Sequence, residues 1–134
     1  MKGKKPKLTV IHGGFVAGKC PAAPSWLSAH AKAEWKRAAP QLHSRGLLTP
    51  DTLATLESYC LAVGAVRELE EIMQRDGRVI DGEDGPKTHP AFRMQGAAMR
   101  EARLLASELG LTPHRRGAGK EKGPADGWDA DLLP

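Results

Sequence analysis

The sequence predicts an all-α protein with three main helices, of which the central one is the longest. Apolar residues recur every three or four positions through three segments, and each segment is bounded by residues that cap or break helices. Aromatic residues make up only 4% of the 134 residues, so the core depends on Leu, Val and Ala. A single helical domain with few aromatic residues favours a protomer that completes its core in an oligomer.

The chain divides into an arm, a helical core and a tail. Residues 1–25 contain five lysines, four of them in residues 1–7. They also contain a short extended piece at 8–11 and then closely spaced glycines and prolines that break helices, which predicts a flexible basic arm. Residues 26–113 form the predicted helical oligomerisation core. Residues 114–134 are rich in Gly, Lys and Asp, which is typical of a disordered tail that is basic at first and then acidic.

The first helix is predicted from a Ser25 or Ser28 cap to about Ser44. Pro40 falls inside it and predicts a kink or an early end, because a proline in a regular helix interior costs ~3 kcal/mol. One face of this helix repeats apolar residues at helical spacing: Leu27, Ala31, Trp35, Ala38 and Leu42. Trp35 therefore belongs to the core, and Trp26 has the position of a hydrophobic staple at the start of the helix. Stacking of these tryptophans on bases is the less favoured alternative.

The second helix is predicted from about Pro50 to Arg75, with Thr49 as its cap. The following residues form its wide apolar stripe: Leu53, Leu56, Cys60, Val63, Val66, Leu69 and Met73. The charged residues Arg67, Glu68, Glu70, Glu71 and Arg75 are expected to face outward. A helix of this length in a small domain favours a stripe shared between another helix and another subunit.

Residues 78–86 combine turn glycines with a β-branched pair, so a small hairpin and a mobile loop are both open. The third helix is predicted from near Pro90 to Leu109. Its expected apolar stripe is Met94, Ala98, Ala102, Leu105 and Leu109. Gly110 is expected to end this helix in a left-handed conformation, because Pro113 prevents its continuation.

The net charge of +4 is carried by the two ends of the chain. Residues 1–7 contribute four positive charges and residues 114–123 a net of three, whereas residues 124–134 contribute three negative charges and residues 8–113 are neutral. Basic arms of this kind track phosphates, although tails that only maintain solubility are an equal alternative. The predicted phosphate contacts are Lys2, Lys4, Lys5, Lys7, Arg115, Arg116, Lys120 and Lys122. Beyond them lies an acidic and hydrophobic segment that is predicted to dock on a partner: Trp128, Asp129, Asp131, Leu132 and Leu133.

The sequence offers no catalytic constellation, and we expect neither an enzyme nor a cofactor. Residues 13–20 approach a phosphate-binding loop, but Cys20 stands where that loop needs a hydroxyl, and prolines disrupt the next turn. The histidines and cysteines lack paired metal-ligand spacing. Cys60 lies on the apolar stripe and is interpreted as a core residue, and His89 is interpreted as a residue that caps or positions the third helix.

Several short segments, in order, resemble the small subunit of tailed-bacteriophage terminases over roughly residues 8–116. They are residues 24–27 leading into 31–35, then Tyr59-Cys60, His89-Pro90 and residues 109–113. The full set of matching residues is Leu8 to Gly13, Pro24, Trp26, Leu27, Trp35, Leu42, Gly46, Leu47, Leu48, Asp51, Leu53, Tyr59, Cys60, Gly77, His89, Pro90, Leu109, Gly110, Leu111, Thr112, Pro113 and a following Arg. Their joint order is specific, although each one alone is common.

The resemblance implies a non-enzymatic helical subunit that assembles as a homo-oligomeric ring of about nine copies. It implies binding of concatemeric double-stranded viral DNA and regulation of a large subunit that carries the ATPase and nuclease activities. Its expected location is the host cytoplasm, which agrees with two thiols and with the lack of any apolar run long enough to span a membrane.

A small helix-turn-helix transcriptional regulator is the alternative, because Gly46-Leu47-Leu48-Thr49 joins two helices. Its weakness is the candidate recognition helix, which opens with Asp51 and Glu57 and offers no arginine before Arg67.

Overall fold

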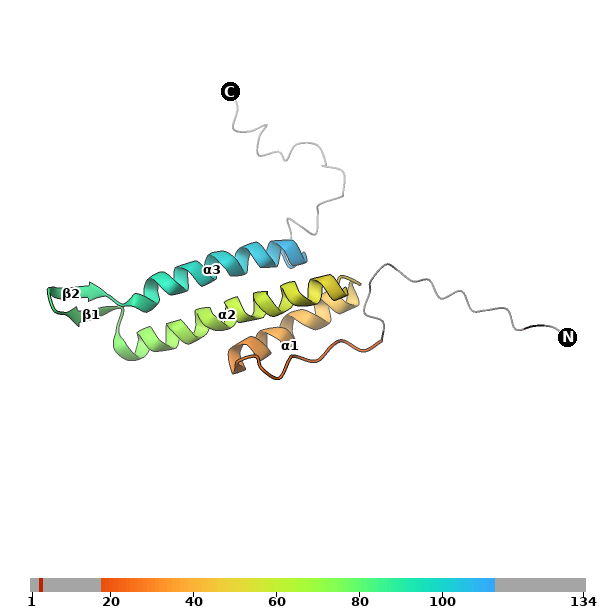
Figure 1. Ribbon diagram of the computed structural model, residues 1–134, viewed down its shortest axis with the longest axis horizontal. Coiled ribbons are helices and arrows are strands. Elements are labelled where there is room, and N and C mark those ends of the chain that lie inside the picture. The colour runs from red at the N-terminus through yellow and green to blue at the C-terminus, as the bar shows by residue number, and fades with distance from the viewer. Residues whose placement is uncertain (1–2, 4–17, 113–134) are drawn as a thin grey trace, which may run out of the picture.

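The structure of the protein is a computed structural model that describes residue 3 and residues 18–112. Its elements are α1 (Ala29–Ser44), α2 (Pro50–Asp76), β1 (Val79–Gly82), β2 (Gly85–Thr88) and α3 (Pro90–Leu109). The helices lie side by side, with α2 between α1 and α3, and the two strands project beyond one end of the helices (Figure 1). The predicted all-α class with a long central helix is confirmed.

Helix α1 is capped at its start by Ser28, whose hydroxyl accepts a hydrogen bond from the N–H of Ala31. The helix continues through Pro40 to Ser44, so the expectation of an early end was wrong. Pro40 is exposed, whereas Ala39 and Leu42 on either side of it are buried and hold the helix against the core.

The residue immediately before the α1 cap is Leu27, and it is buried. Trp26 is 60% exposed, so the interpretation of Trp26 as a staple was wrong. Because Ser28 is the cap, the staple position before it belongs to Leu27, and the Leu27 side chain, not that of Trp26, packs inward. Trp35 is buried as predicted, and its indole N–H donates to the carbonyl of Pro21 at 2.9 Å.

The long helix α2 begins with a reciprocal capping arrangement. The Thr49 hydroxyl accepts from the N–H of Thr52, and the Thr52 hydroxyl accepts from the N–H of Thr49, while Pro50 occupies the first helical position. The helix ends at Gly77, which has a φ of 87° and donates its N–H to Met73. Where α2 crosses α1, Gly64 is buried against the backbone of Ala31. The lack of a side chain at this position lets the two helices approach closely.

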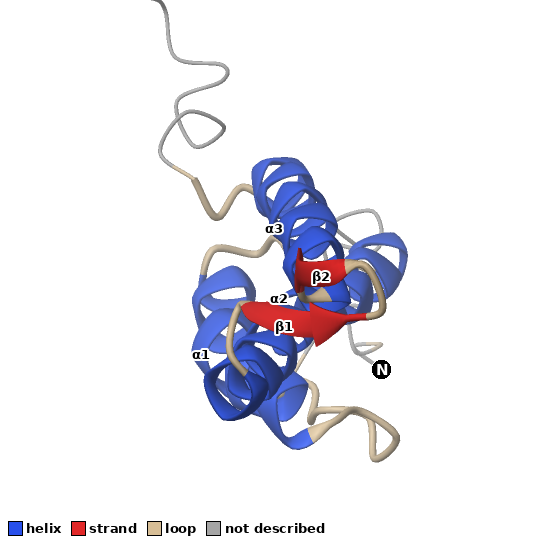
Figure 2. Cartoon of the chain, turned by 90° about the vertical axis from the view of Figure 1, so that its left-hand side faces the viewer, coloured by secondary structure: helices blue, strands red, loops and turns tan. Residues whose placement is uncertain are grey.

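A two-stranded antiparallel hairpin joins α2 to α3, and its register pairs Val79 with Thr88 and Gly82 with Gly85. Of the two alternatives for this segment, the hairpin is therefore the one that forms. Figure 2 shows the two strands viewed along the helices. His89 follows the hairpin and caps α3, because its ring Nδ1 accepts from the N–H of Ala91 at 2.9 Å. At the other end Gly110 is left-handed with a φ of 79°, as predicted.

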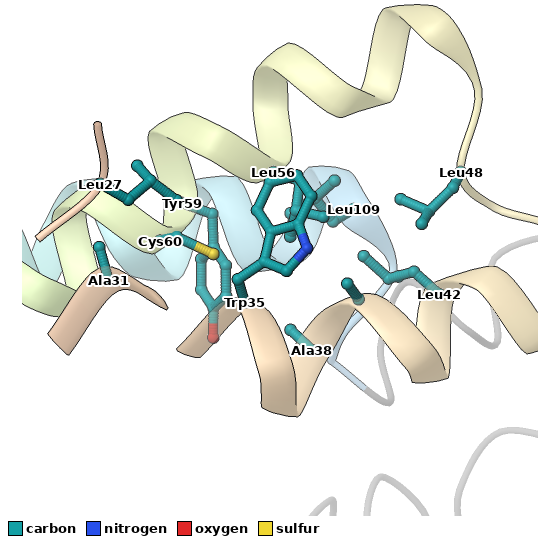
Figure 3. Packing of buried hydrophobic residues seen from close by; sticks show 11 residues of the cluster. Leu27, Ala31, Trp35, Ala38, Leu42, Leu48, Leu56, Tyr59, Cys60 and Leu109 are labelled. Atoms are coloured by element: carbon teal, nitrogen blue, oxygen red, sulfur yellow. The ribbon is translucent and has the colours of Figure 1, made fainter. Parts of the chain in front are cut away.

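The core lies between α1, the first part of α2 and the end of α3 (Figure 3). Its eleven buried residues are Leu27, Ala31, Trp35, Ala38, Ala39, Leu42, Leu48, Leu56, Tyr59, Cys60 and Leu109. Cys60 is fully buried, which confirms its interpretation as a core residue.

The buried face of α3 differs from the predicted stripe at its beginning. Met94 is 59% exposed, and Ala91 and Gln95 are buried in its place. Gln95 faces inward because its amide donates to the backbone carbonyl of Val66 and to the carboxylate of Glu70. A periodicity argument that counts only apolar residues does not find this polar contact.

Candidate functional surfaces

The site residues predicted from the sequence lie outside the described residues. This holds for the phosphate contacts Lys2, Lys4, Lys5, Lys7, Arg115, Arg116, Lys120 and Lys122, and for the docking segment with Trp128, Asp129, Asp131, Leu132 and Leu133. Their assignment therefore stays a prediction. Residues 18–112 contain equal numbers of basic and acidic side chains, so the described helical body is electrically balanced.

A buried carboxylate joins α1 to α2. Glu34 is 5% exposed, and its Oε1 accepts a hydrogen bond from the hydroxyl of Tyr59 at 2.8 Å. The guanidinium of Arg37, one turn further along α1, donates Nε–H to both carboxylate oxygens at 2.8 and 3.0 Å. Its Nη2 also donates to Glu34 and to the Tyr59 hydroxyl. The three side chains satisfy one another across the α1–α2 contact.

The environment of this network fixes its protonation states. Burial raises the pKa of Glu34, but the hydrogen bonds from Arg37 and Tyr59 outweigh it and leave the carboxyl pKa below its usual value. Burial, together with the hydrogen bond to Glu34, raises the pKa of the Tyr59 hydroxyl to about 12. At neutral pH the cluster is therefore an ionised carboxylate, a guanidinium and a neutral phenol. These states suit a structural contact and provide no group ready to transfer a proton.

A second network connects α2, the hairpin and α3 through Glu70. Arg78 donates Nη2–H to both oxygens of Glu70 at 2.8 and 2.9 Å, and Gln95 donates to Oε2 at 2.9 Å. These bonds hold the pKa of the Glu70 carboxyl below its usual value. Glu70 was expected to face outward, and its side chain is 31% exposed, but its carboxylate also bonds to groups at the junction of α3 with the hairpin.

His89 makes a further contact at this junction. Its Nδ1 accepts the backbone hydrogen bond that caps α3, so in the neutral ring the proton is on Nε2, which donates to Asp76 at 3.0 Å. Arg75, and then His89, lower the pKa of the Asp76 carboxyl to about 2. The predicted role of His89 in capping and positioning α3 is confirmed.

The chemistry of the remaining candidate side chains is that of a folded core. Burial raises the pKa of the Cys60 thiol to about 12, which keeps it protonated and unreactive at neutral pH. Within the described residues no group of three or more His, Cys, Asp or Glu side chains is arranged to hold a metal ion. No helix in that part of the chain has the length and apolar character needed to cross a membrane.

A helical body with internal ion pairs and charged ends agrees with the comparisons. The family model described as phage terminase, small subunit, matches residues 31–126, which is more than half of the chain. The chain belongs to this family. No curated protein and no solved structure matches this small terminase subunit. Its family places it in phage DNA packaging, where small subunits are generally regulatory.

The matched region begins within α1, at Ala31, and includes α2, the hairpin and α3. It also includes Arg115, Arg116, Lys120 and Lys122 of the predicted phosphate contacts, but none of the four lysines in residues 1–7. The family assignment of this small terminase subunit thus rests on the helical body and the basic segment that follows it.

One surface of this small terminase subunit was not anticipated from the sequence. It is the solvent-exposed side of α3, where Arg93, Arg100 and Arg103 are exposed beside Phe92 and Met99. The sequence-based argument summed the charge of residues 8–113 to zero and did not consider how the arginines of this helix are distributed around it. A helical-wheel comparison of residues 92–104 would have found it, because these residues recur at helical spacing.

Proposed function

We propose that this small terminase subunit binds concatemeric double-stranded viral DNA and regulates the ATPase and nuclease of the large terminase subunit in the host cytoplasm. The observation that carries this proposal is the family match over residues 31–126. The regulatory role is supported by the family, whose small subunits are generally regulatory. The proposed DNA contacts are the eight basic residues of the two ends, because these segments carry the net positive charge of the chain.

The oligomeric form of the proposed adaptor is a ring of about nine copies. Each copy brings two short basic segments, whose individual contacts with phosphate are weak. Repetition around a closed ring gives high avidity for a long DNA without a strong single site. The segment with Trp128, Leu132 and Leu133 is proposed to dock on the large subunit.

The DNA contacts are tested by the salt dependence of DNA binding, measured by fluorescence anisotropy with a duplex. Each neutralised phosphate contributes about −0.9 to the slope of log K against log salt. Replacement of Lys2, Lys4, Lys5 and Lys7 by Ala, or of Arg115, Arg116, Lys120 and Lys122 by Ala, should each make the slope shallower by up to about 3.6.

The matched control replaces four cationic residues of the helical body: Lys36, Arg45, Arg67 and Lys87. All four are exposed and have no ion pair within the described residues. Their removal changes the net charge by the same amount and should change the slope far less. An equal effect of control and arm variants would show that net charge alone attracts DNA, and would refute the assignment to the arms.

The ring is tested by the native mass of the full chain, measured by light scattering or native mass spectrometry. A single closed oligomer supports the proposal. A monomer or dimer over a wide concentration range would favour a helix-turn-helix regulator instead. Against that alternative stand the family match and the start of α2, where Asp51 is exposed and the first arginine is Arg67.

A further inference from the structure

The outer face of α3 is formed by two neighbouring rows of side chains. One row is Arg93, Ala97, Arg100 and Leu104, and the other is Phe92, Gly96, Met99 and Arg103. Residues at spacings of four, three and four stand above one another on a helix. All except half-buried Gly96 are exposed, so this face has no covering element within residues 18–112.

The three arginines of the outer face lack acidic partners in the described part of the chain. Elsewhere in that part, Arg37, Arg75 and Arg78 each pair with a carboxylate. The acidic residues of α3, Glu101 and Glu108, border this face, four residues after Ala97 and Leu104, but neither forms an ion pair with its arginines. The outer face of α3 is therefore a positively charged strip on an otherwise balanced body.

The same face exposes large apolar side chains between the arginines. Phe92 is 53% and Leu104 56% exposed, and Met99 is exposed as well. Over the first half of α3 these side chains border an open hollow of about 990 Å³, which Phe92, Arg93, Met99 and Arg100 line. Planar guanidinium groups next to exposed apolar side chains can bind a ligand that combines carboxylates with apolar side chains.

The chain itself contains a segment of that chemistry. Residues 126–133 alternate three aspartates with Trp128, Leu132 and Leu133, and contain no basic residue. The three negative charges equal the number of arginines on the outer face of α3. Phe92, Met99 and Leu104 offer apolar contacts for the tryptophan and the leucines.

The length of chain between the two fits such a contact. Thirteen residues, 113–125, separate Thr112 from Asp126. Such a linker reaches ~45 Å when extended, and a random coil of this length has an end-to-end distance of about 20 Å. With a rise of 1.5 Å per residue, Arg100 lies about 14 Å and Arg93 about 24 Å back along α3 from Leu109. A linker whose coil length matches the required span gives the highest effective concentration of the tethered segment.

We propose that residues 126–133 bind to the outer face of α3 in the same chain, with aspartates on Arg93, Arg100 and Arg103 and with Trp128 against Phe92 and Met99. This inference goes beyond the proposed function, which assigns the segment to the large subunit. The two assignments are compatible if the partner displaces the segment from α3. The contact then keeps an apolar peptide covered until the partner is present.

The contact is tested by acrylamide quenching of tryptophan fluorescence in the full chain carrying Trp26→Phe. Trp35 is 3% exposed, so Trp128 supplies the accessible emission. In the Trp26→Phe chain, Trp128 should be quenched less than in a free peptide of residues 124–134. Adding Arg93→Glu, Arg100→Glu and Arg103→Glu should raise the quenching constant about threefold, which corresponds to release of a segment that is about two thirds bound.

A charge-matched control reverses Lys36 on α1, Arg45 at the end of α1 and Lys87 on β2. It should leave the quenching constant unchanged. Acrylamide is uncharged, so the comparison is free of a direct charge effect on the quencher. Circular dichroism verifies that both triple variants keep their helices, as expected for exposed positions.

Four results would overturn the proposal. If Trp128 in the full chain is quenched as strongly as in the free peptide, the segment is not bound. If Trp128 stays shielded from acrylamide after the three arginines are reversed, the segment binds at another place on the protein. Shielding that is lost on dilution shows binding between chains. If a second copy covers α3, the arginine variants lower the native mass while Trp128 stays accessible throughout. DNA binding through the arms is measured separately and is unaffected by any of these outcomes.

Discussion

The Tyr59 hydroxyl of α2 donates a hydrogen bond of 2.8 Å to the buried Glu34 carboxylate of α1, and Arg37 donates to the same carboxylate. A buried carboxylate is stable only when its hydrogen bonds are complete. The α1–α2 contact therefore depends on a polar network as well as on apolar packing.

Tyr59→Phe should lower the free energy of unfolding by about 1.5–3 kcal/mol, because one hydrogen bond to a charged acceptor is lost while Arg37 remains. Glu34→Gln keeps the shape and removes the charge. If the pair is coupled, the double variant should lose less than the sum of the single losses, by about 0.5–3 kcal/mol. Urea unfolding of the four proteins measures this difference, and strict additivity would show that the two groups do not act together.

Gly64→Ala should destabilise the protein, because the new Cβ would lie 2.9 Å from the backbone nitrogen of Ala31. The helices would have to separate, at a cost of about 1–3 kcal/mol. Gly96→Ala is the matched control, since its Cβ meets only Arg100 Nη1, at 3.5 Å. There the gain in helix propensity should raise stability by up to about 1 kcal/mol. The midpoint temperature of thermal unfolding should fall for Gly64→Ala and rise for Gly96→Ala. A lower midpoint in both variants would contradict the close-contact argument.

Stability should fall as the pH rises above about 9, because Cys60 and Tyr59 keep their protons in the folded state up to a pKa of about 12. In the unfolded chain the thiol ionises near 8.5 and the phenol near 10, at ordinary values. The unfolded state then binds fewer protons, so the free energy of unfolding decreases with pH.

Cys60→Ala should make this alkaline decrease shallower from about pH 9, and Tyr59→Phe should do so from about pH 10. Cys20→Ala, at a half-buried thiol outside the helices, is the control for removal of a cysteine. Denaturant midpoints measured from pH 7 to 11 test the assignment. If Cys60→Ala loses stability at alkaline pH as steeply as the original protein, ionisation of Cys60 is not the cause of that loss.

His89→Ala should cost about 1 kcal/mol, because the N–H of Ala91 loses its acceptor and Asp76 loses a donor. His89→Asn should recover most of this stability, since asparagine is a strong helix cap. Hydrogen exchange of the first turn of α3 distinguishes the two variants: it should accelerate in the alanine protein and stay near the original rate in the asparagine protein.

The helix ends were predictable because they depend on local chemistry. Thr49 before Pro50 and the left-handed Gly110 are signals that neighbouring residues alone create. The buried positions of α3 were less predictable. Gln95 is buried because its amide donates a hydrogen bond to a backbone carbonyl on α2, 29 residues earlier. For the same reason, periodicity placed Met94 inward and did not find the bonds of Glu70. Tertiary hydrogen bonds of this kind leave no repeating pattern in the sequence.

The candidate site was predicted only in part. The density of lysines at the ends was visible in the sequence, but the sequence-based argument summed the charge of the body to zero and overlooked its distribution. Arg93 and Arg100 are seven residues apart and so share a face of α3, and neither Glu101 nor Glu108 forms an ion pair with them. Which side of α3 is open to solvent is settled by its packing against α2.

The order of the helices also has a consequence for the rate of folding. Both helices that contact α2 are its neighbours in the sequence, joined to it by a short turn on one side and by the hairpin on the other. Loop closure between such neighbours loses little entropy, and chains rich in local contacts fold on the microsecond to millisecond scale. A newly synthesised protomer should thus reach its helical form far sooner than it meets other copies at cellular concentrations.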